Sequence, residues 1–408
     1  MTTDTTDVVV TGLGATTPLG GDVPSTWAGM LAGESGVGAI EEEWAAGLPV
    51  RIAGRLRVEP GEVMDRVQAR RLDRCEQIAL IAAREAWADA GRPQVEPERL
   101  AVVIGTGTGG ALSMLGQDDV LEASGVRKVS PHTVPMLMAN GPAAWVSIEL
   151  GARGGARTPV SACASGAEAI AMGLDLIRLG RADVVVAGGA EACVHPLPLA
   201  GFAQAKAHST RNEAPREASR PFDTGRDGFV IGEGAALVVL ERAGFAAARA
   251  ARVHAVLAGA GVTSDAHHIT AAHRDGQVRA MRLALASAGL GPLDVRQVHA
   301  HATSTPQGDL TEAESIAEAI GTHPAVTATK SMTGHLFGAA GALGAVAAVL
   351  ALRDQVVPAT RNLDELDPRV RLDVAAGRPR RGVPGAALTN SFGFGGHNAS
   401  LVFTAGRG

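Results

Sequence analysis

The sequence has few cysteines, few aromatic residues and no tyrosine. Its 408 residues include 3 Cys, 8 Phe and 4 Trp. Three cysteines do not build a disulfide framework, and no C-x-x-C pair offers a zinc site. A nucleic-acid binder usually needs stacking aromatics and a basic excess, whereas this chain has 37 basic and 42 acidic residues. These absences exclude disulfide scaffolds and zinc ribbons, and they disfavour nucleic-acid binding.

Long apolar runs and signal-like ends are also missing. The first residues, MTTDTTD, carry two acids and no basic stretch, unlike a secretory signal. No segment has the ~20 uninterrupted apolar residues of a membrane helix, and the richest one, 338–352, predicts a buried core helix. With 46% hydrophobic residues and a net charge of −5, the chain is not disordered. We expect a soluble cytoplasmic protein with reduced thiols and no membrane contact.

Short apolar runs alternate with longer helical patterns, which predicts an α/β fold with buried sheets. The expected strands are 8–10, 101–104, 158–161, 183–187, 235–240, 254–257, 297–300, 326–329 and 401–403, and the expected helices include 72–90, 164–179, 278–289 and 338–353. VVVTGLGATT (8–17) resembles AVLAGAGVTS (255–264), and both halves later enter a long helix through small residues. The repeat predicts two similar halves, 1–250 and 251–408, that meet near 240–255.

Cys163 is the main candidate for a nucleophile. It lies in S-A-C-A-S-G, after an expected strand and at the start of an expected helix. Unpaired N–H groups and the helix dipole favour a thiolate at such a position. Its small neighbours would let an extended substrate reach the sulfur. A buried structural cysteine is the alternative, and it is our interpretation of Cys75 and Cys193.

Two histidines and a lysine occupy small-residue turns near expected strand ends, namely His301, Lys330 and His335. A thiol with two imidazoles and an ammonium suits acyl transfer, in which imidazoles donate to a thioester carbonyl as it becomes an enolate. The glycine-rich run 391–398 can complete an oxyanion hole with its N–H groups. A purely structural role is the alternative for each histidine, and His299 shares a strand face with His301.

Cofactor and metal signals are weak. GTGTGG (105–110) lacks the spacing and the acidic partner of a dinucleotide fingerprint, and no phosphate-binding loop is present. The histidines at 267, 268 and 273 have no metal-ligand spacing. We therefore expect neither a nucleotide cofactor nor a metal.

Six motifs, in order, resemble the condensing-enzyme family of the thiolase superfamily, specifically its 3-oxoacyl-(acyl-carrier-protein) synthase II branch. They are VTGLGATTPLG, VSACASGAEAI, STRNEAPREASRPFDTGRDGFVIGEGAA, HATSTPQGD, TKSMTGH and NSFGFGGHN, and the likeness spans about 7 to 404. The resemblance implies a thiolase-like fold of two similar halves in five α/β/α/β/α layers. It implies condensation of malonyl-carrier protein with an acyl chain held as a thioester, which lengthens the chain by two carbons in fatty-acid synthesis. Phosphopantetheine then arrives on the acyl-carrier protein, and the enzyme needs no cofactor of its own.

The resemblance also implies a role for individual residues. Cys163 is the nucleophile, and His301 and His335 stabilise the malonyl-derived enolate. Lys330 orders the site, paired with Glu312. The oxyanion hole uses the N–H groups of Cys163 and of Phe394, which is also the gate. The remaining matched positions form groups: the gate glycines Gly393, Gly395 and Gly396; the supporting Asp309; the substrate-binding Thr108, Phe202, Thr270, Thr303, Thr305 and Phe392; and the carrier-docking Arg70, Arg71, Lys206, Arg127 and Lys128.

Several positions depart from the family pattern, and they leave the pathway open. They are Ala139, His299, Ala302 and Gly344, with a polar Thr108 where the family is usually apolar. One alternative is a ketosynthase of a type II polyketide pathway, paired with a chain-length factor. Another is a non-catalytic partner resembling a chain-length factor, which predicts loss of the nucleophile; here the cysteine is present. We expect a homodimer, or a heterodimer with a chain-length factor.

Overall fold

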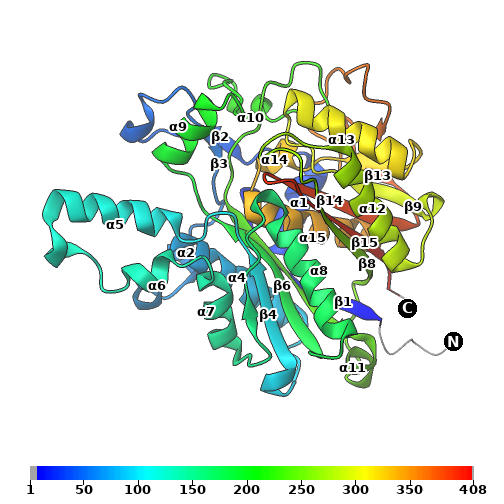
Figure 1. Cartoon of the computed structure of the whole chain (residues 1–408), viewed down its shortest axis with the longest axis horizontal. Helices are drawn as coiled ribbons and strands as arrows, with labels where there is room; N and C mark the ends of the chain where they lie inside the picture. The colour runs from blue at the N-terminus through cyan, green and yellow to red at the C-terminus, as the bar shows by residue number, and fades with distance from the viewer. Residues whose placement is uncertain (1–6, 407–408) are drawn as a thin grey trace.

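The computed structural model describes residues 7–406, and two topologically equivalent halves share one sheet in it (Figure 1). The strand order of this 11-stranded sheet is β12-β10-β9-β14-β15-β8-β1-β7-β6-β4-β5. The five main strands of each half, numbered by appearance, follow the same spatial order, third-second-fourth-fifth-first. Parallel and antiparallel pairings also recur in the same places. The repeat predicted from 8–17 and 255–264 is therefore the first strand of each half.

The first half is built on strands that read as continuous apolar runs. They are β1 (Val8–Thr16), β4 (Leu100–Gly105), β5 (Ala156–Arg157), β6 (Val184–Glu191) and β7 (Gly234–Arg242). β6 is buried throughout, as expected for a strand covered on both faces. Helices α4 (Arg74–Asp89) and α7 (Gly141–Leu150) cover the outer face. A capping box of Asp73 and Glu76 starts α4.

The second half repeats this plan. Its strands are β8 (Ala255–Ser264), β9 (Val295–His299), β10 (Ala325–Thr327), β14 (Ala386–Gly393) and β15 (His397–Ala405), with the short β12 (Asp373–Val374) at the edge. Helices α12 (Arg274–Ala288) and α13 (Pro306–Ala319) cover its outer face. The halves join where β1 pairs with β8, at Val9 opposite Val256.

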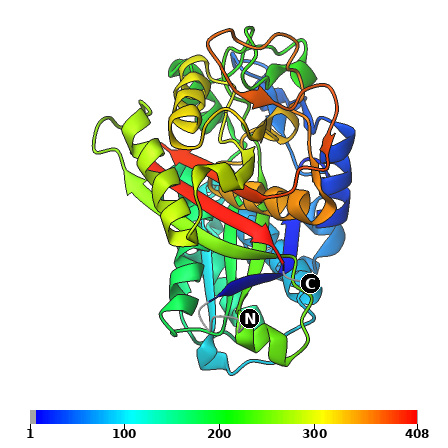
Figure 2. The ribbon, with the colours of Figure 1, turned by 90° about the vertical axis from the view of Figure 1, so that its right-hand side faces the viewer.

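Two central helices lie between the halves and form the middle layer of the five-layer α/β/α/β/α arrangement (Figure 2). They are α8 (Ser165–Arg178) and α15 (Ala340–Asp354), and they pack against each other and against strands of both halves. Within residues 7–406, one helical segment, Phe337–Asp354, is long and apolar enough to cross a membrane. Because 89% of that segment is buried inside the protein, it is the core helix that the sequence predicted. The predicted fold class is confirmed.

Smaller elements surround these layers. Helices α5 (Ala111–Ser124) and α6 (Thr133–Leu137) form an arm that stands away from the body in Figure 1. The other helices are α1 (Val23–Ala32), α2 (Pro60–Val63), α3 (Arg66–Ala69), α9 (Pro196–Gln204), α10 (Pro215–Ala218), α11 (Ala243–Ala248) and α14 (Lys330–Thr333). The short strands are β2 (Val37–Ala39), β3 (Ile52–Gly54), β11 (Val356–Val357) and β13 (Arg380–Arg381).

Most predicted elements are present, with two instructive differences. The run 158–161 is not a strand: β5 ends at Arg157, and Pro159 has no N–H to continue a ladder. Strand β14 was not predicted, because its Thr, Asn and Ser residues interrupt the apolar pattern. The N-terminal residues 1–6, where no signal is expected, lie outside the described part of the chain.

Candidate active site

A cavity of about 650 Å³ gathers residues from both halves. Cys163 comes from the first half, and His301 and His335 come from the second. The other predicted site residues at its wall are Thr108, Phe202, Lys206, Thr270, Thr303, Thr305, Glu312, Phe392, Gly393, Phe394 and Gly396. Lys330 and Asp309 lie buried outside the wall.

A sharp turn presents Cys163 to this cavity. A single turn of 3-10 helix, Ala162–Ala164, precedes α8, and Ala162 has a positive φ of 50°. Such a strained non-glycine residue persists only where its surroundings hold it. The Ser165 hydroxyl does so, because it donates to the Ala162 carbonyl at 2.7 Å and accepts from the Ser161 N–H at 2.9 Å. Cys163 therefore begins a helix as predicted, but it follows a loop rather than a strand.

The thiol of Cys163 is neutral at ordinary pH in this structure. Burial raises its pKa to about 12, although the Lys330 charge and the N–H groups of Phe394 and Cys163 act in the lowering direction. The N–H groups thus act in the direction that the sequence predicted, but burial acts more strongly in the opposite direction. Desolvation of the charged form outweighs the helix dipole and the N–H groups. A thiolate at Cys163 thus needs a neighbouring hydrogen-bond donor that stabilises its charge.

His335 is that neighbour. Its Nε2 lies 3.0 Å from the Cys163 sulfur. The Phe337 N–H donates to Nδ1 at 3.3 Å, which leaves the ring proton on Nε2. Burial, with the Lys330 charge, lowers the pKa of His335 well below its usual value, so the ring is neutral at ordinary pH. A neutral imidazole aimed at this position donates a hydrogen bond to a sulfur or to a carbonyl oxygen.

His301 is held from two sides through its backbone. Lys330 Nζ donates to the His301 carbonyl at 2.5 Å. The Glu312 carboxylate accepts the N–H of His301 at 2.8 Å and that of Ala302 at 2.6 Å. Lys330 and Glu312 therefore do not form the predicted direct ion pair. Both instead form hydrogen bonds to the backbone of the same turn. Burial, with the Lys330 charge, also lowers the pKa of His301 well below its usual value.

Lys330 is the positively charged group of this buried cluster. Burial lowers its pKa to about 8, while Glu312 raises it. Nδ1 of His301 has no hydrogen-bond partner within residues 7–406. The two imidazoles meet edge to face, with ring centroids 5.4 Å apart. Two neutral imidazoles facing one cavity can together bind a developing oxyanion or enolate.

The backbone segments of the predicted oxyanion hole pack closely against each other. Gly393 lies so close to the nucleophile turn that an added Cβ would sit 2.5 Å from the Ser161 carbonyl oxygen. This approach brings the Phe394 N–H near the sulfur, where it acts on the thiol together with the Cys163 N–H. The Ser391 hydroxyl fixes the turn from behind by donating to the Cys163 carbonyl at 2.9 Å. The Phe394 ring itself is 43% exposed.

Glu191 is a site residue that the sequence reasoning missed. It is fully buried at the end of β6, and its carboxylate accepts from the N–H groups of Gly107, Thr108 and Gly338 at 2.7, 3.1 and 3.0 Å. The Thr108 hydroxyl also donates to it at 2.7 Å. The sequence signal that could have identified it is an acidic residue at the end of an otherwise apolar strand. The polar Thr108 is thus explained in part by its bond to Glu191.

The segment after the gate is tied to a neighbouring loop. The Gly395 N–H donates to the Ile269 carbonyl at 2.6 Å, and the Asp265 N–H donates to the Gly396 carbonyl at 2.8 Å. The predicted Thr270 is exposed beside these contacts. Two backbone hydrogen bonds therefore join the 265–270 loop to the glycine-rich gate.

Other predicted residues have less defined places. The docking residues are all exposed, and of them only Lys206 lines the cavity: Arg70, Arg71, Arg127, Lys128 and Lys206. Cys193, predicted to be structural, is buried but also lines the cavity with Cys163. Within residues 7–406, no group of three His, Cys, Asp or Glu side chains could hold a metal ion.

Two of the departures from the family pattern form one structural pair. Gly344, in α15, faces His299: an added Cβ would lie 2.9 Å from His299 Nδ1 and 2.7 Å from Thr389 Oγ1. His299 Nε2 lies 2.8 Å from the Thr329 hydroxyl, just before Lys330. The missing side chain at Gly344 thus makes room for the imidazole at His299.

Comparisons with known proteins agree on one family. The models "Beta-ketoacyl synthase, N-terminal domain" and "Beta-ketoacyl synthase, C-terminal domain" match residues 5–246 and 254–364. The 3-oxoacyl-(acyl-carrier-protein) synthase 2 of Mycobacterium tuberculosis is 46% identical over 402 residues, covering 97% of this chain and 96% of that protein.

Two solved structures are also similar over nearly the whole chain. The ishigamide ketosynthase/chain length factor has a TM-score of 0.92 at 34% identity, covering 98% of this chain and 99% of that one. A type II polyketide ketosynthase bound to a hexaketide, in complex with its acyl-carrier protein, has a TM-score of 0.90 at 30% identity, with the same coverage.

Proposed function

This chain belongs to the beta-ketoacyl synthase family of condensing enzymes, and from that premise we propose that it catalyses the condensation step of fatty-acid synthesis. The substrates are an acyl chain and a malonyl group, each carried as a thioester on acyl-carrier protein. The carrier supplies the phosphopantetheine arm, and the chain uses no cofactor of its own. The observation that carries the proposal is Cys163 at 3.0 Å from His335 Nε2, in a cavity that His301 shares.

In the first half-reaction, the Cys163 sulfur attacks the carbonyl carbon of the acyl thioester. The Cys163–acyl bond forms, the bond to the pantetheine sulfur breaks, and the thiol proton leaves with the released carrier thiol. His335 Nε2, which carries the ring proton, can donate to the sulfur while charge develops on it. The N–H groups of Cys163 and Phe394 stabilise the tetrahedral oxyanion. Support comes from their shared influence on the sulfur.

In the second half-reaction, malonyl-carrier protein enters and loses CO₂. The electron pair of the broken carbon–carbon bond forms an enolate, whose oxygen accepts hydrogen bonds from His301 and His335. Both rings are neutral because burial lowers their pKa values, so each can keep a proton on the nitrogen that donates. The enolate carbon then attacks the acyl-enzyme, the Cys163–acyl bond breaks, and the product is two carbons longer.

We assign the carrier arm to the strip of hydroxyls at the cavity wall. Thr303 Oγ1 and Thr305 Oγ1 lie 3.2 Å apart there and can bond the amide groups of phosphopantetheine. The acidic carrier would meet the exposed basic residues, of which Lys206 is at the cavity itself. A cytoplasmic location fits a reaction whose substrates ride on a soluble carrier.

We further propose that the chain works as a homodimer. Helices α5 and α6 and their connection expose apolar side chains, and such a patch is typical of an interaction surface. The exposed apolar residues in and next to these helices are Met114, Leu121, Val126, Val134 and Met138. A heterodimer with a chain-length factor would use the same arm. Light scattering of the purified chain separates these outcomes, because the homodimer forms without a second gene product.

A polyketide pathway is the second candidate, favoured by one observation. The Thr108 hydroxyl at the cavity wall donates to Glu191 and keeps its own lone pairs free to accept from an enol or hydroxyl group of a polyketide chain. An elongation assay decides between the two. Acyl-carrier proteins loaded with saturated chains of graded length, or with 3-oxo chains, are offered with malonyl-carrier protein, and products are read by mass spectrometry.

3-Oxo products two carbons longer than the saturated chains offered support fatty-acid synthesis, and repeated extension of 3-oxo chains supports the polyketide candidate. A Cys163→Ala variant is the matched control. If that variant still elongates, the mechanism is wrong.

A further inference from the structure

A buried arginine, Arg226, lies behind the hydroxyl pair that we assign to the carrier arm. Its side chain is 2% exposed. Nε donates to the Thr305 carbonyl at 3.2 Å, and Nη2 donates to the Pro306 carbonyl at 2.7 Å. Nη1 lies 2.9 Å from a carboxylate oxygen of Asp367. The guanidinium thus joins three separate segments of the chain.

The segment that Arg226 holds has an unusual backbone. Ser304 has a φ of 73°, in the left-handed region that a non-glycine residue seldom adopts. Thr303 and Thr305 flank this residue, and their hydroxyls lie 3.2 Å apart at the same cavity wall. The placement of both hydroxyls therefore depends on the Ser304 turn.

Three further contacts fix that turn. The Ser304 N–H donates to Asp309 Oδ1 at 3.0 Å, and its carbonyl accepts the Gly228 N–H at 3.0 Å. Its hydroxyl accepts the Arg220 N–H at 2.9 Å. Two of these donors, Arg220 and Gly228, flank Arg226 in the chain. The loop 220–228 thus holds the turn in two ways: through the backbone N–H groups of Arg220 and Gly228, and through the side chain of Arg226.

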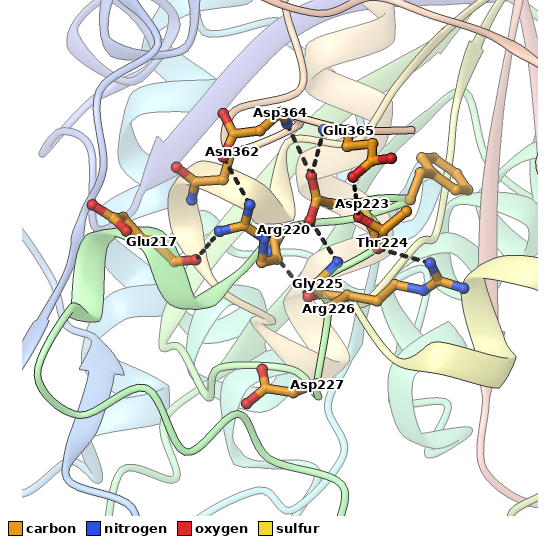
Figure 3. Close-up of polar contacts among 12 residues, drawn as sticks. Glu217, Arg220, Asp223, Thr224, Gly225, Arg226, Asp227, Asn362, Asp364 and Glu365 are labelled. Atoms are coloured by element: carbon orange, nitrogen blue, oxygen red, sulfur yellow. Dashed lines mark hydrogen bonds and ion pairs between the residues drawn. The ribbon is translucent and has the colours of Figure 1, made fainter. Parts of the chain in front are cut away.

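The loop is in turn anchored to the segment 362–369 (Figure 3). Arg220 donates to Asp223 and Asp364, each at 2.8 Å. Asp223 accepts the N–H groups of Asp364 and Glu365 at 2.9 Å each. The figure shows Arg220, Asp364 and Glu365 around Asp223, and the Arg226 guanidinium donates to the Asp223 carbonyl at 2.8 Å. The network thus runs from the segment 362–369 through Asp223 and Arg226 to Thr305 at the cavity wall.

An arginine suits this position because its planar fork donates in several directions at once. A lysine would keep the positive charge beside Asp309 and Asp367, but its single nitrogen could not bond both carbonyls and both acids. The substitution Arg226→Lys therefore separates charge neutralisation from the geometry of the turn.

We propose that Arg226 is a positioning residue that sets the affinity for the phosphopantetheine arm by holding the Thr303–Thr305 turn. Its polar contacts are with Asp223, Thr305, Pro306, Asp309 and Asp367, and none is with Cys163 or the two site histidines. This inference rests on the proposed function, because it assigns the carrier arm to the two threonines.

The test compares Arg226→Lys with the parent chain on octanoyl-carrier protein. The expected result is a KM about tenfold higher, equivalent to about 1.4 kcal/mol, with kcat within twofold. The S-ethyl thioester of octanoic acid lacks both amide groups of the arm, and its kcat/KM should be unchanged. The rate of Cys163 alkylation by iodoacetamide should be unchanged as well.

Arg369→Lys is the matched control. Its side chain is 63% exposed and pairs with the same Asp367, yet it contacts neither carbonyl. An unchanged KM in Arg226→Lys would overturn the proposal. So would equal losses on both substrates with slower alkylation, because these would mark a general structural defect.

If Arg226→Lys does not fold, Asp367→Asn decides, since it keeps the guanidinium and removes one of its anchors. A rise in KM confined to the carrier substrate supports the proposal, and no rise overturns it. Failure of the proposed function itself would look different: the parent chain would not elongate, and alkylation would have no effect on any activity.

Discussion

Glu312→Gln tests how the His301 turn is organised. The carboxylate accepts two backbone N–H groups, at 2.8 and 2.6 Å, and an Asn390 amide proton at 3.2 Å. A glutamine has the same shape, but its NH₂ group would face one of these donors and leave it unpaired. A lost hydrogen bond to a charged group costs about 1.5–3 kcal/mol. If that whole loss falls on the enolate-binding geometry, decarboxylation slows by about 10- to 150-fold.

The same substitution has a signed effect on pH dependence. Burial lowers the pKa of Lys330 to about 8, and the Glu312 charge acts against that lowering. Without the charge, the pKa of Lys330 falls further, so the ammonium that holds the His301 carbonyl is lost at a lower pH. The alkaline limb of the rate profile should therefore move to lower pH than in the parent chain.

The assay follows CO₂ release from malonyl-carrier protein across pH, with thermal unfolding recorded in parallel. Glu314→Gln is the matched control, because Glu314 lies on the same helix with its side chain 51% exposed. A Glu312→Gln variant within twofold of the parent rate, with an unmoved alkaline limb, would refute the reasoning. Equal loss in the Glu314 control would also refute it.

Three further predictions concern other parts of the molecule. Cys163→Gln should lose condensation but still release CO₂ from malonyl-carrier protein, because the imidazoles remain; radiolabelled malonyl substrate measures both. Gly344→Ala should destabilise the fold by about 1–3 kcal/mol in urea unfolding, because the added carbon would meet His299 and Thr389. Charge reversal of the docking residues should weaken carrier binding most at low salt, as titration calorimetry would record, in Arg70→Glu, Arg71→Glu and Lys206→Glu.

Each of these has an opposing outcome. Loss of CO₂ release in Cys163→Gln would argue against the histidine roles. Gly201→Ala is the control for Gly344→Ala, because its added Cβ has no atom within 4 Å, and equal unfolding curves for the two variants would contradict the crowding at Gly344. Carrier affinity that stays unchanged at low salt would reject the docking patch.

The architecture could be predicted from the sequence because its signals are local or periodic. The likeness of 8–17 to 255–264 marks the equivalent first strands, and the apolar run 338–352 marks the central helix α15. The loop at 158–161 was missed because an apolar run hides the effect of Pro159. Strand β14 was missed because polar residues on a buried strand break the pattern.

The sequence by itself identified the groups that we propose for the chemistry: one cysteine in a small-residue turn, two histidines, a lysine and a glycine-rich gate. Only the tertiary structure decided their contacts and their protonation states. His335 meets Cys163 across 172 residues of chain, and no spacing rule reports that distance. Burial raises the pKa of the thiol and lowers those of both imidazoles, and desolvation belongs to the folded interior rather than to any motif. The same holds for Glu191, for the Lys330 and Glu312 clamp, and for Arg226, whose partners come together only when the two halves close on one cavity.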